Sequence, residues 1–69
     1  MKQKRFRRLG VHAVCYKNKT YSQCVVETDG ERVVGWFHFD GELPMTEWRG
    51  GTVYIDDICG EMRIVRTEP

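Results

Sequence analysis

The dipeptide Asp29-Gly30 lies between two runs of apolar residues, and this arrangement constrains the fold more than any other feature of the sequence. A two-residue type I′ hairpin turn requires positive φ at both central residues, and Asp-Gly is one of the pairs that favours it. A turn at this position predicts two antiparallel strands in which Val26 lies opposite Val33.

A weaker turn signal, Asn18-Lys19, lies upstream. Asn tolerates the left-handed region of φ/ψ space, whereas Lys does so poorly. A turn here places Tyr16 opposite Tyr21 and adds a third strand. The two hairpins together predict an antiparallel meander whose strands cover about residues 7–16, 20–28 and 31–39.

Side chains alternate between the two faces of a strand, so both hairpins must sort the same residues onto each face. They do, and a slip of one residue in either hairpin would destroy the sorting. The face predicted to form the core carries Leu9, Val11, Ala13, Cys15, Cys24, Val26, Val33, Gly35, Phe37 and Phe39. The opposite face carries His12, Val14, Tyr16, Tyr21, Val25, Val34, Trp36 and His38, with Gln23 and a cross-strand Glu27–Arg32 pair.

Residues 40–51 interrupt the pattern, because Pro44 cannot donate a ladder hydrogen bond and Gly50-Gly51 forms a flexible hinge. Residues 43–48 could form one helical turn. Two interpretations are open: the segment packs against an open end of the sheet, or it is a functional loop. We favour packing, through Leu43, Met45 or Trp48.

The C-terminal residues predict a second hairpin, with strands over 52–56 and 62–67 and a turn at Cys59-Gly60. An apolar pair and an ion pair then fall on opposite faces. The predicted pairs are Ile55 with Ile64, Asp56 with Arg63, and Tyr54 with Val65. A turn at Asp56-Asp57 is the alternative.

The chain has 69 residues, which suits one domain near the lower size limit for a self-sufficient core. We predict an all-β fold, a five-stranded antiparallel curled sheet or small partly open barrel, with one short helical turn at most. We expect residues 9–69 to form the domain and residues 1–8 to form a basic arm. A chain this small often gains stability from a second subunit.

Charge is distributed unevenly along the chain. Residues 1–8 carry five basic residues and no acidic residue, whereas residues 9–69 carry six basic and ten acidic residues, a net charge of −4. Such an arm is either a solubilising tail or a set of contacts to an acidic partner, and we favour the tail. Its basic residues are Lys2, Lys4, Arg5, Arg7 and Arg8.

Neither catalysis nor metal binding is predicted. Asp56 and Asp57 are adjacent, so in a strand they point to opposite faces and cannot act as an acid–base pair. His12 and His38 share a predicted face but lie about 15 Å apart, too far for one metal ion. We therefore predict no enzyme, no metal and no cofactor.

The cysteines indicate a reducing compartment. They are odd in number and include no Cys-x-x-Cys pair, so we expect ordinary thiols and a cytoplasmic protein. A disulfide between Cys15 and Cys24 is conceivable but not favoured, because disulfide geometry is strict. No apolar run approaches the roughly 20 residues that a membrane span requires, and we predict no membrane partner.

The second face of the meander is the predicted site, formed by Tyr16, Tyr21, Trp36, His38, Val14 and Val34. Monomers usually avoid an exposed aromatic patch of this kind. Three interpretations are open. The helical turn or the second hairpin covers the face; the face binds a second copy or another protein, where Tyr and Trp are enriched; or it stacks bases of single-stranded nucleic acid.

We predict a non-enzymatic interaction module that self-associates, as a homodimer, or binds another protein through this face. The alternative is weak single-stranded nucleic-acid binding by the aromatic face together with the basic arm. Lys and Arg supply most non-specific affinity for phosphate, and the acidic body of the chain makes this alternative the weaker one.

Overall fold

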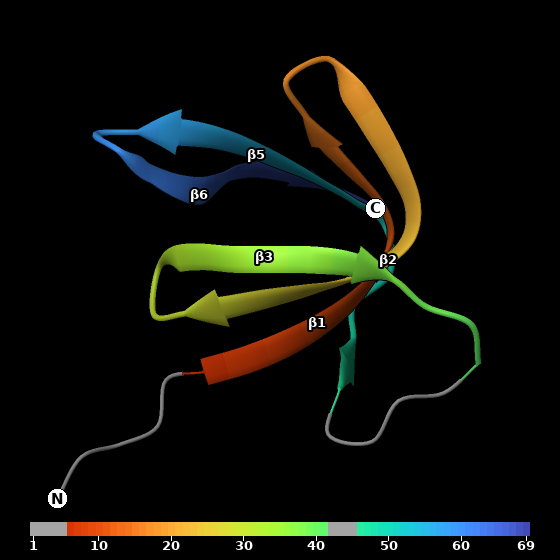
Figure 1. Ribbon diagram of the computed structural model, residues 1–69. Coiled ribbons are helices and arrows are strands. Elements are labelled where there is room, and N and C mark those ends of the chain that lie inside the picture. The colour runs from red at the N-terminus through yellow and green to blue at the C-terminus, as the bar shows by residue number, and fades with distance from the viewer. Residues whose placement is uncertain (1–5, 42–45) are drawn as a thin grey trace, which may run out of the picture.

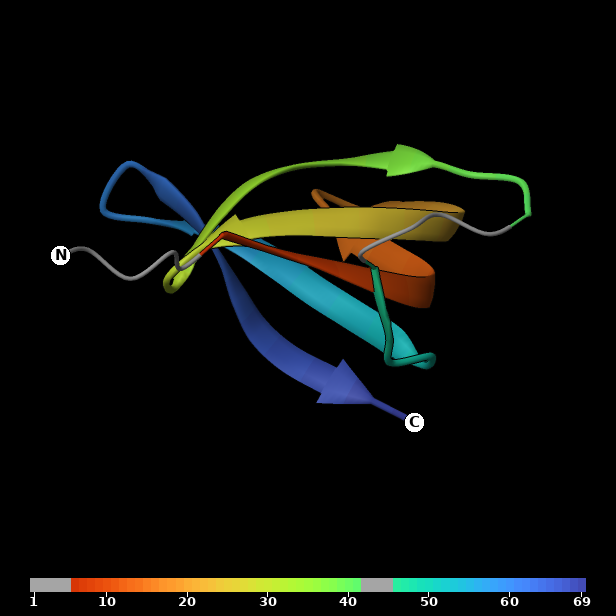
Figure 2. The same ribbon diagram turned by 90° about the horizontal axis from the view of Figure 1, so that it is seen from below.

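The computed structural model describes residues 6–41 and 46–69, and within these ranges the chain is all β, with no helix. The strands are β1 (Phe6–Tyr16), β2 (Lys19–Asp29), β3 (Arg32–His38), β4 (Glu47–Trp48), β5 (Thr52–Ile58) and β6 (Glu61–Glu68). They form one sheet in the order β3-β2-β1-β5-β6, and β4 pairs with β1 outside this order. Figure 2 shows the strands fanning out in the same order. The predicted all-β fold is confirmed.

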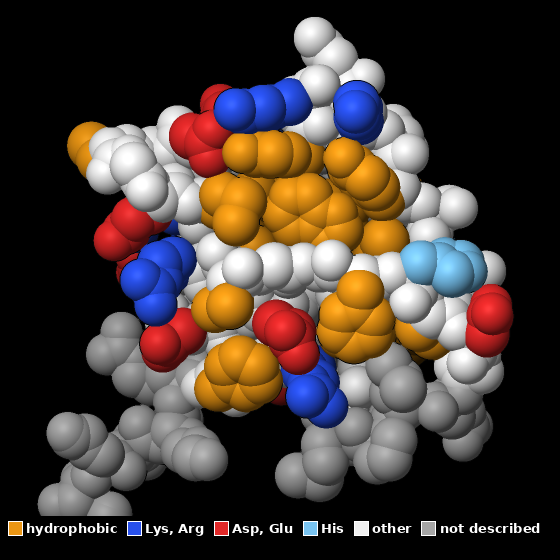
Figure 3. Space-filling model, in the orientation of Figure 1, with side chains coloured by type: hydrophobic (Ala, Val, Ile, Leu, Met, Phe, Trp, Pro, Cys, Tyr) orange, Lys and Arg blue, Asp and Glu red, His pale blue; other side chains and the backbone are white. Residues whose placement is uncertain are grey.

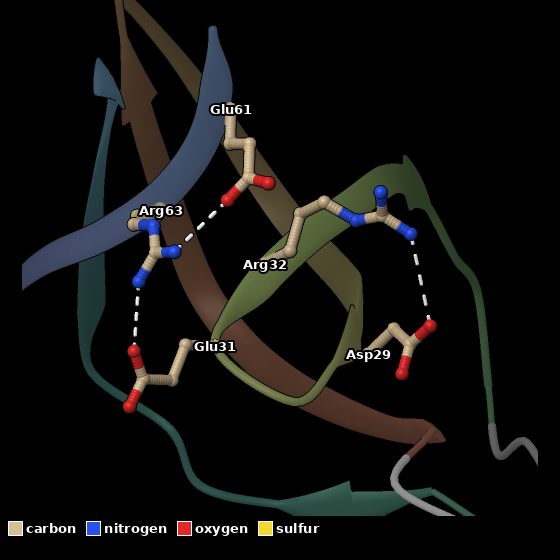
Figure 4. Close-up of polar contacts among 5 residues, drawn as sticks. All are labelled: Asp29, Glu31, Arg32, Glu61 and Arg63. Atoms are coloured by element: carbon tan, nitrogen blue, oxygen red, sulfur yellow. Dashed lines mark hydrogen bonds and ion pairs between the residues drawn. The ribbon is translucent and has the colours of Figure 1, made fainter. Parts of the chain in front are cut away.

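The sheet curls until its two edge strands, β3 and β6, lie close together, and the described residues form no backbone ladder between them. We call this junction the seam; in Figure 1 the β5–β6 hairpin lies above β3. At one end of the seam Arg63 of β6 contacts Glu31 in the β2–β3 turn at 2.7 Å and Glu61 at 2.9 Å, as Figure 4 shows. The predicted curled sheet is thus confirmed, and it is not closed into a barrel.

The sheet is mixed, because β1 lies at its centre and runs parallel to β5, from Ala13 opposite Thr52 to Tyr16 opposite Ile55. β3 also runs in the direction of β1, so the chain must return to the other end of the sheet before it starts β5. Strands that run in the same direction cannot be joined by a tight turn, which explains the long connection after β3. The predicted helical turn at 43–48 is wrong for its last two residues, because Glu47 and Trp48 form the extended strand β4, parallel to β1. Leu43, Pro44 and Met45 lie outside the described residues.

The β1–β2 turn differs from the prediction by one residue. It lies at Lys17-Asn18, with φ of 51° and 66°, so that Tyr16 pairs with Lys19 and Val14 with Tyr21. The predicted turn and the observed turn each place one lysine in the left-handed region, so the residue types of the turn do not favour one over the other. Pairing along the whole of both strands decides the register instead.

The β2–β3 turn lies at Gly30-Glu31 rather than Asp29-Gly30. Gly30 has a φ of 67°, whereas Glu31 is not among the residues with positive φ, a pattern expected of a type II′ turn. Asp29 pairs with Arg32 and contacts its guanidinium at 3.7 Å (Figure 4), so the predicted Glu27–Arg32 pair is wrong.

A β-bulge in β3 then reverses the predicted faces. Val33 pairs with Thr28 and Gly35 with Glu27, which leaves Val34 as an extra residue. An extra residue shifts the alternation of side chains by one position. Trp36 consequently lies opposite Val26, on the inner face. The prediction that Gly35, Phe37 and Phe39 face the core is wrong for this reason.

A second irregularity shifts β1. The amides of His12 and Ala13 both donate to the Gly51 carbonyl, at 2.9 and 3.2 Å, a hydrogen-bond pattern seen at β-bulges. Val11 and Val14 are therefore both fully buried although they are three residues apart. Val14 had been predicted on the exposed face, and Ala13 and Cys15, predicted to lie in the core, are half-buried.

The C-terminal hairpin follows its predicted turn. Cys59 and Gly60 have φ of 52° and 80°, which both central residues of a type I′ turn require. The pairs Ile55–Ile64 and Asp56–Arg63 are confirmed in register, although Arg63 forms its ion pairs with the two glutamates of the seam. The predicted Tyr54–Val65 pair is wrong, because a bulge at Val65 places Arg66 opposite Tyr54.

The core fills the inside of the curl and consists largely of β-branched side chains, which suit a pleated surface. Buried apolar residues come from β1, β2, β3 and β5, and Met62 and Ile64 of β6 pack against them. The buried apolar residues inside the curl are Leu9, Val11, Val14, Cys24, Val26, Val33, Val53 and Ile55. Val25 is also fully buried, but it lies opposite Phe37 on the outer face.

Candidate protein-interaction surface

Three aromatic side chains meet where β1, β2 and β3 face the seam. The Trp36 ring lies 5.1 Å from the Tyr16 ring and 5.6 Å from the Tyr21 ring, with interplanar angles of 72° and 65°. Edge-to-face pairs at this spacing are favourable beyond simple burial. We call these three residues the aromatic cluster. The bulge at Val34 creates it, because without the extra residue Trp36 would point to the outer face.

The aromatic cluster is partly a lid on the core and partly surface. Trp36 and Tyr16 pack against the core together with Met62 and Ile64 of β6, so they cover the seam. Tyr21 keeps 36% of its surface exposed. Figure 3 shows hydrophobic side chains gathered on the face seen in Figure 1, above and below a band of backbone or other side chains, with charged side chains nearby. The second hairpin therefore covers the inner side of the cluster.

Polar groups hold Tyr16 in place at the border of the cluster. Its hydroxyl donates to the Asp57 carboxylate at 3.0 and 3.1 Å, and Lys17 lies 3.2 Å from the same carboxylate. Loss of solvent and then the hydrogen bond to Asp57 raise the pKa of the Tyr16 phenol. The tyrosine therefore stays a neutral donor at neutral pH, and polar groups border the cluster on the Tyr16 side, like the rim residues of protein interfaces.

The structure brings together only part of the predicted face. Tyr16, Tyr21 and Trp36 share a face as predicted, but Tyr16 and Trp36 pack against the core instead of lying on the face opposite to it, and Val14 is buried beneath them. Val34 keeps 49% of its surface exposed at the bulge. His38, at the end of β3, is exposed and contacts the Ser22 carbonyl at 3.1 Å and Asp40 at 3.4 Å.

The basic residues of the predicted nucleic-acid site are in part already neutralised. The Arg7 guanidinium donates two hydrogen bonds to Glu47, at 2.9 and 2.6 Å, and Arg8 donates one to Glu27 at 3.1 Å. Both arginines belong to β1 rather than to a free arm, because this strand begins at Phe6. The other three predicted contacts, Lys2, Lys4 and Arg5, lie outside the described residues.

A second aromatic group lies on the outer face, and the sequence patterns above did not identify it. Trp48 of β4 contacts His12 edge-on, with ring centroids 5.1 Å apart, and Phe39 at 6.2 Å. The indole lies over Gly10, where an added Cβ would be only 2.7 Å from a ring carbon. A glycine inside a strand often marks such a close approach, so Gly10 was the available signal. The favoured interpretation, that the 40–51 segment packs against the sheet, thus holds for Trp48, but this residue packs on the outer face and not against an open end of the sheet.

A hollow of about 520 Å³ lies at the end of the curl opposite the aromatic cluster. Its walls carry the apolar side chains of Leu9, Val11 and Val53 and the guanidiniums of Arg7 and Arg63, among others. Each of these guanidiniums already contacts at least one glutamate. Their positive charge is largely neutralised inside the fold, which makes the hollow a weaker candidate than the aromatic cluster.

Residues 6–41 and 46–69 contain no group of three or more His, Cys, Asp or Glu side chains placed to hold a metal ion. Cys15, Cys24 and Cys59 are free thiols, and burial raises the pKa of the Cys24 thiol. No helix formed by residues 6–41 and 46–69 is long and apolar enough to cross a membrane.

Comparison with known proteins adds no relative to this description. Protein-family models, curated proteins and solved structures contain no match to the chain.

Proposed function

We propose that this chain is a non-enzymatic interaction module that binds protein through the aromatic cluster, with a second copy of the chain as its first candidate partner. The observation that carries the proposal is the position of Trp36. Its ring is held between Tyr16 and Tyr21 at the seam, where the described residues form no backbone ladder between β3 and β6. Rigid Trp and Tyr side chains with a polar rim are the residues on which binding energy concentrates in interfaces.

Nucleic-acid binding is the weaker proposal. Base stacking on the aromatic cluster would need cations beside it to neutralise phosphates. Lys17 at the border of the cluster is held by Asp57, and Arg7 and Arg8 are held by glutamates on other strands.

Free thiols at three positions accord with a reducing compartment, and we place the module inside the cell.

Light scattering on a sizing column tests the proposal, over an approximately tenfold range of protein concentration and at two salt concentrations. We expect a dimer that persists at high salt, because an apolar contact is not screened. Tyr21→Ala should weaken it, since this ring is 36% exposed and its loss does not open the core. Ile58→Ala is the matched control, being 42% exposed at the tip of the β5–β6 hairpin.

A monomer at every concentration and both salt concentrations would refute self-association. A labelled single-stranded oligonucleotide would then be titrated against the wild-type chain and the Tyr21→Ala variant. Binding that Tyr21→Ala abolishes and Ile58→Ala preserves would replace the protein-binding proposal with the nucleic-acid one.

A further inference from the structure

The two edges of the sheet differ in how they are protected. Charged residues recur along β6, at Glu61, Arg63, Arg66 and Glu68. Natural proteins use such charges to prevent an edge strand from pairing with another chain. The edge strand β3 has the sequence RVVGWFH, with a single Lys or Arg at its start and no proline. Of the two edges, β3 is therefore the less protected by charges, although β6 approaches it at the end of the seam where Arg63 contacts Glu31.

The hydrogen-bond pattern shows which backbone groups of β3 are available. The Phe39 amide donates to the Gln23 carbonyl at 3.1 Å, so these two residues form a hydrogen-bonded pair. Such pairs alternate with non-hydrogen-bonded ones along an antiparallel ladder. In the register of β3 against β2, the backbone groups of Trp36 and His38 therefore point away from β2. Among the described residues, β3 is paired only with β2.

Exposed apolar side chains lie on both sides of this open edge. Val34 is 49% exposed at the bulge, and Phe37 is 40% exposed on the outer face. Trp36 of the aromatic cluster lies on the inner face. A strand added beside β3 would thus gain backbone hydrogen bonds and cover apolar surface on both of its faces.

We propose that β3 pairs antiparallel with β3 of a second copy of this chain, centred near Trp36, so that the two sheets become continuous. This proposal rests on the proposed function and specifies how its partner binds. The charges at the two ends of the strand select a second copy as the occupant. Arg32 and Asp40 each lie four residues from Trp36, on opposite sides of it.

An antiparallel two-fold arrangement therefore brings Arg32 of each copy toward Asp40 of the other. Both side chains are largely exposed. Asp40 is 92% exposed and touches His38, and Arg32 is 53% exposed, with Asp29 as a distant partner at 3.7 Å. A contact in which the same patch serves on both copies is the commonest form of protein dimer.

The first test places a lysine at each edge. Val34 and Val65 are matched, because each is the extra residue of a bulge and they are 49% and 51% exposed. We expect Val34→Lys to raise the dissociation constant of the dimer by at least about tenfold, since a charged side chain opposes edge pairing. Val65→Lys, on the edge that already carries charges, should leave it unchanged.

A charge swap tests the choice of occupant. Asp40→Arg alone should weaken the dimer, because Arg32 of one copy would then meet a like charge. Arg32→Glu combined with Asp40→Arg restores opposite charges across the two-fold axis and should recover most of the affinity. A peptide or an unrelated protein on this edge would show no such recovery.

Amide hydrogen exchange provides a readout that does not depend on any substitution. The Trp36 and His38 amides should exchange slowly at high protein concentration and faster on dilution. A dimer that survives Val34→Lys, with these two amides exchanging equally at every concentration, would overturn edge pairing and leave the aromatic cluster itself as the interface. A wild-type monomer under all conditions would overturn both proposals.

Discussion

Replacing Gly10 by alanine should destabilise the fold through one side chain, Trp48. A Cβ at Gly10 would lie 2.7 and 3.1 Å from two carbons of the Trp48 ring, whereas ordinary contact begins at 3.4 Å. The backbone does not oppose the change, because Gly10 is not among the residues with positive φ. The indole must therefore move by at least 0.7 Å, away from its contacts with His12 and Phe39.

Overpacking of this kind costs about 1–3 kcal/mol. Trp48 is 57% exposed and can yield toward solvent, so we expect a value of about 1–2 kcal/mol, at the low end of the range. The reduced freedom of the unfolded chain on changing Gly to Ala offsets about 0.5 kcal/mol. The net destabilisation should be about 1 kcal/mol, or roughly 4–8 °C in Tm for a domain of this size.

The measurement is urea unfolding followed by far-ultraviolet circular dichroism, for the wild type, Gly10→Ala, Trp48→Ala and the double variant. If the ring causes the penalty, Gly10→Ala should be neutral or slightly stabilising once Trp48 is gone. The coupling between the two sites should then be about 1–2 kcal/mol.

Gly35→Ala serves as the control, because nothing lies within 4 Å of a Cβ added there. It should be near neutral. If Gly10→Ala costs the same with and without the indole, the close approach of Trp48 does not set the penalty and the reasoning fails.

Two further predictions concern backbone strain and an exposed ion pair. Gly51→Ala should cost at least about 2–3 kcal/mol in the same unfolding assay, because φ is 68° and the added Cβ would overlap the Glu68 carbonyl oxygen. Gly60→Ala is the control, because Gly60 also has positive φ but has open space around it, and it should cost about 1 kcal/mol. Equal losses of stability in the two variants would contradict the overlap at Gly51. The hydrogen bond from Arg7 lowers the pKa of the Glu47 carboxyl below its ordinary value. The pair therefore stabilises the fold fully at any pH above that ordinary pKa, and this stabilisation is lost as the pH falls through the lowered pKa of the folded state. A carbon-detected NMR titration should find this lowered pKa in the wild type and a return toward the ordinary value in Arg7→Gln; an unchanged Glu47 titration in that variant would show that the ion pair does not form.

The parts of the fold that local chemistry specifies were predictable from the sequence. Alternating β-branched residues between Gly- and Asn-containing turns predicted strands and no long helix. Cys59-Gly60 fixed both the turn and the adjoining register of the last hairpin, because two left-handed residues accommodate only a tight reversal. The sequence also predicted that Tyr16, Tyr21 and Trp36 share a face, but the predicted register and the predicted face were wrong, because Tyr16 and Trp36 pack against the core.

Tertiary structure decided which faces those strands present. An extra residue at Val34 moves Trp36 inside and Phe37 outside, and a similar shift in β1 buries Val14. Neither bulge has a local sequence signal, since each depends on the side chains that other strands bring to the same place. The parallel pairing of β1 with β5 and the packing of Trp48 on Gly10 join residues 38 or 39 positions apart, and only the assembled sheet brings such residues together.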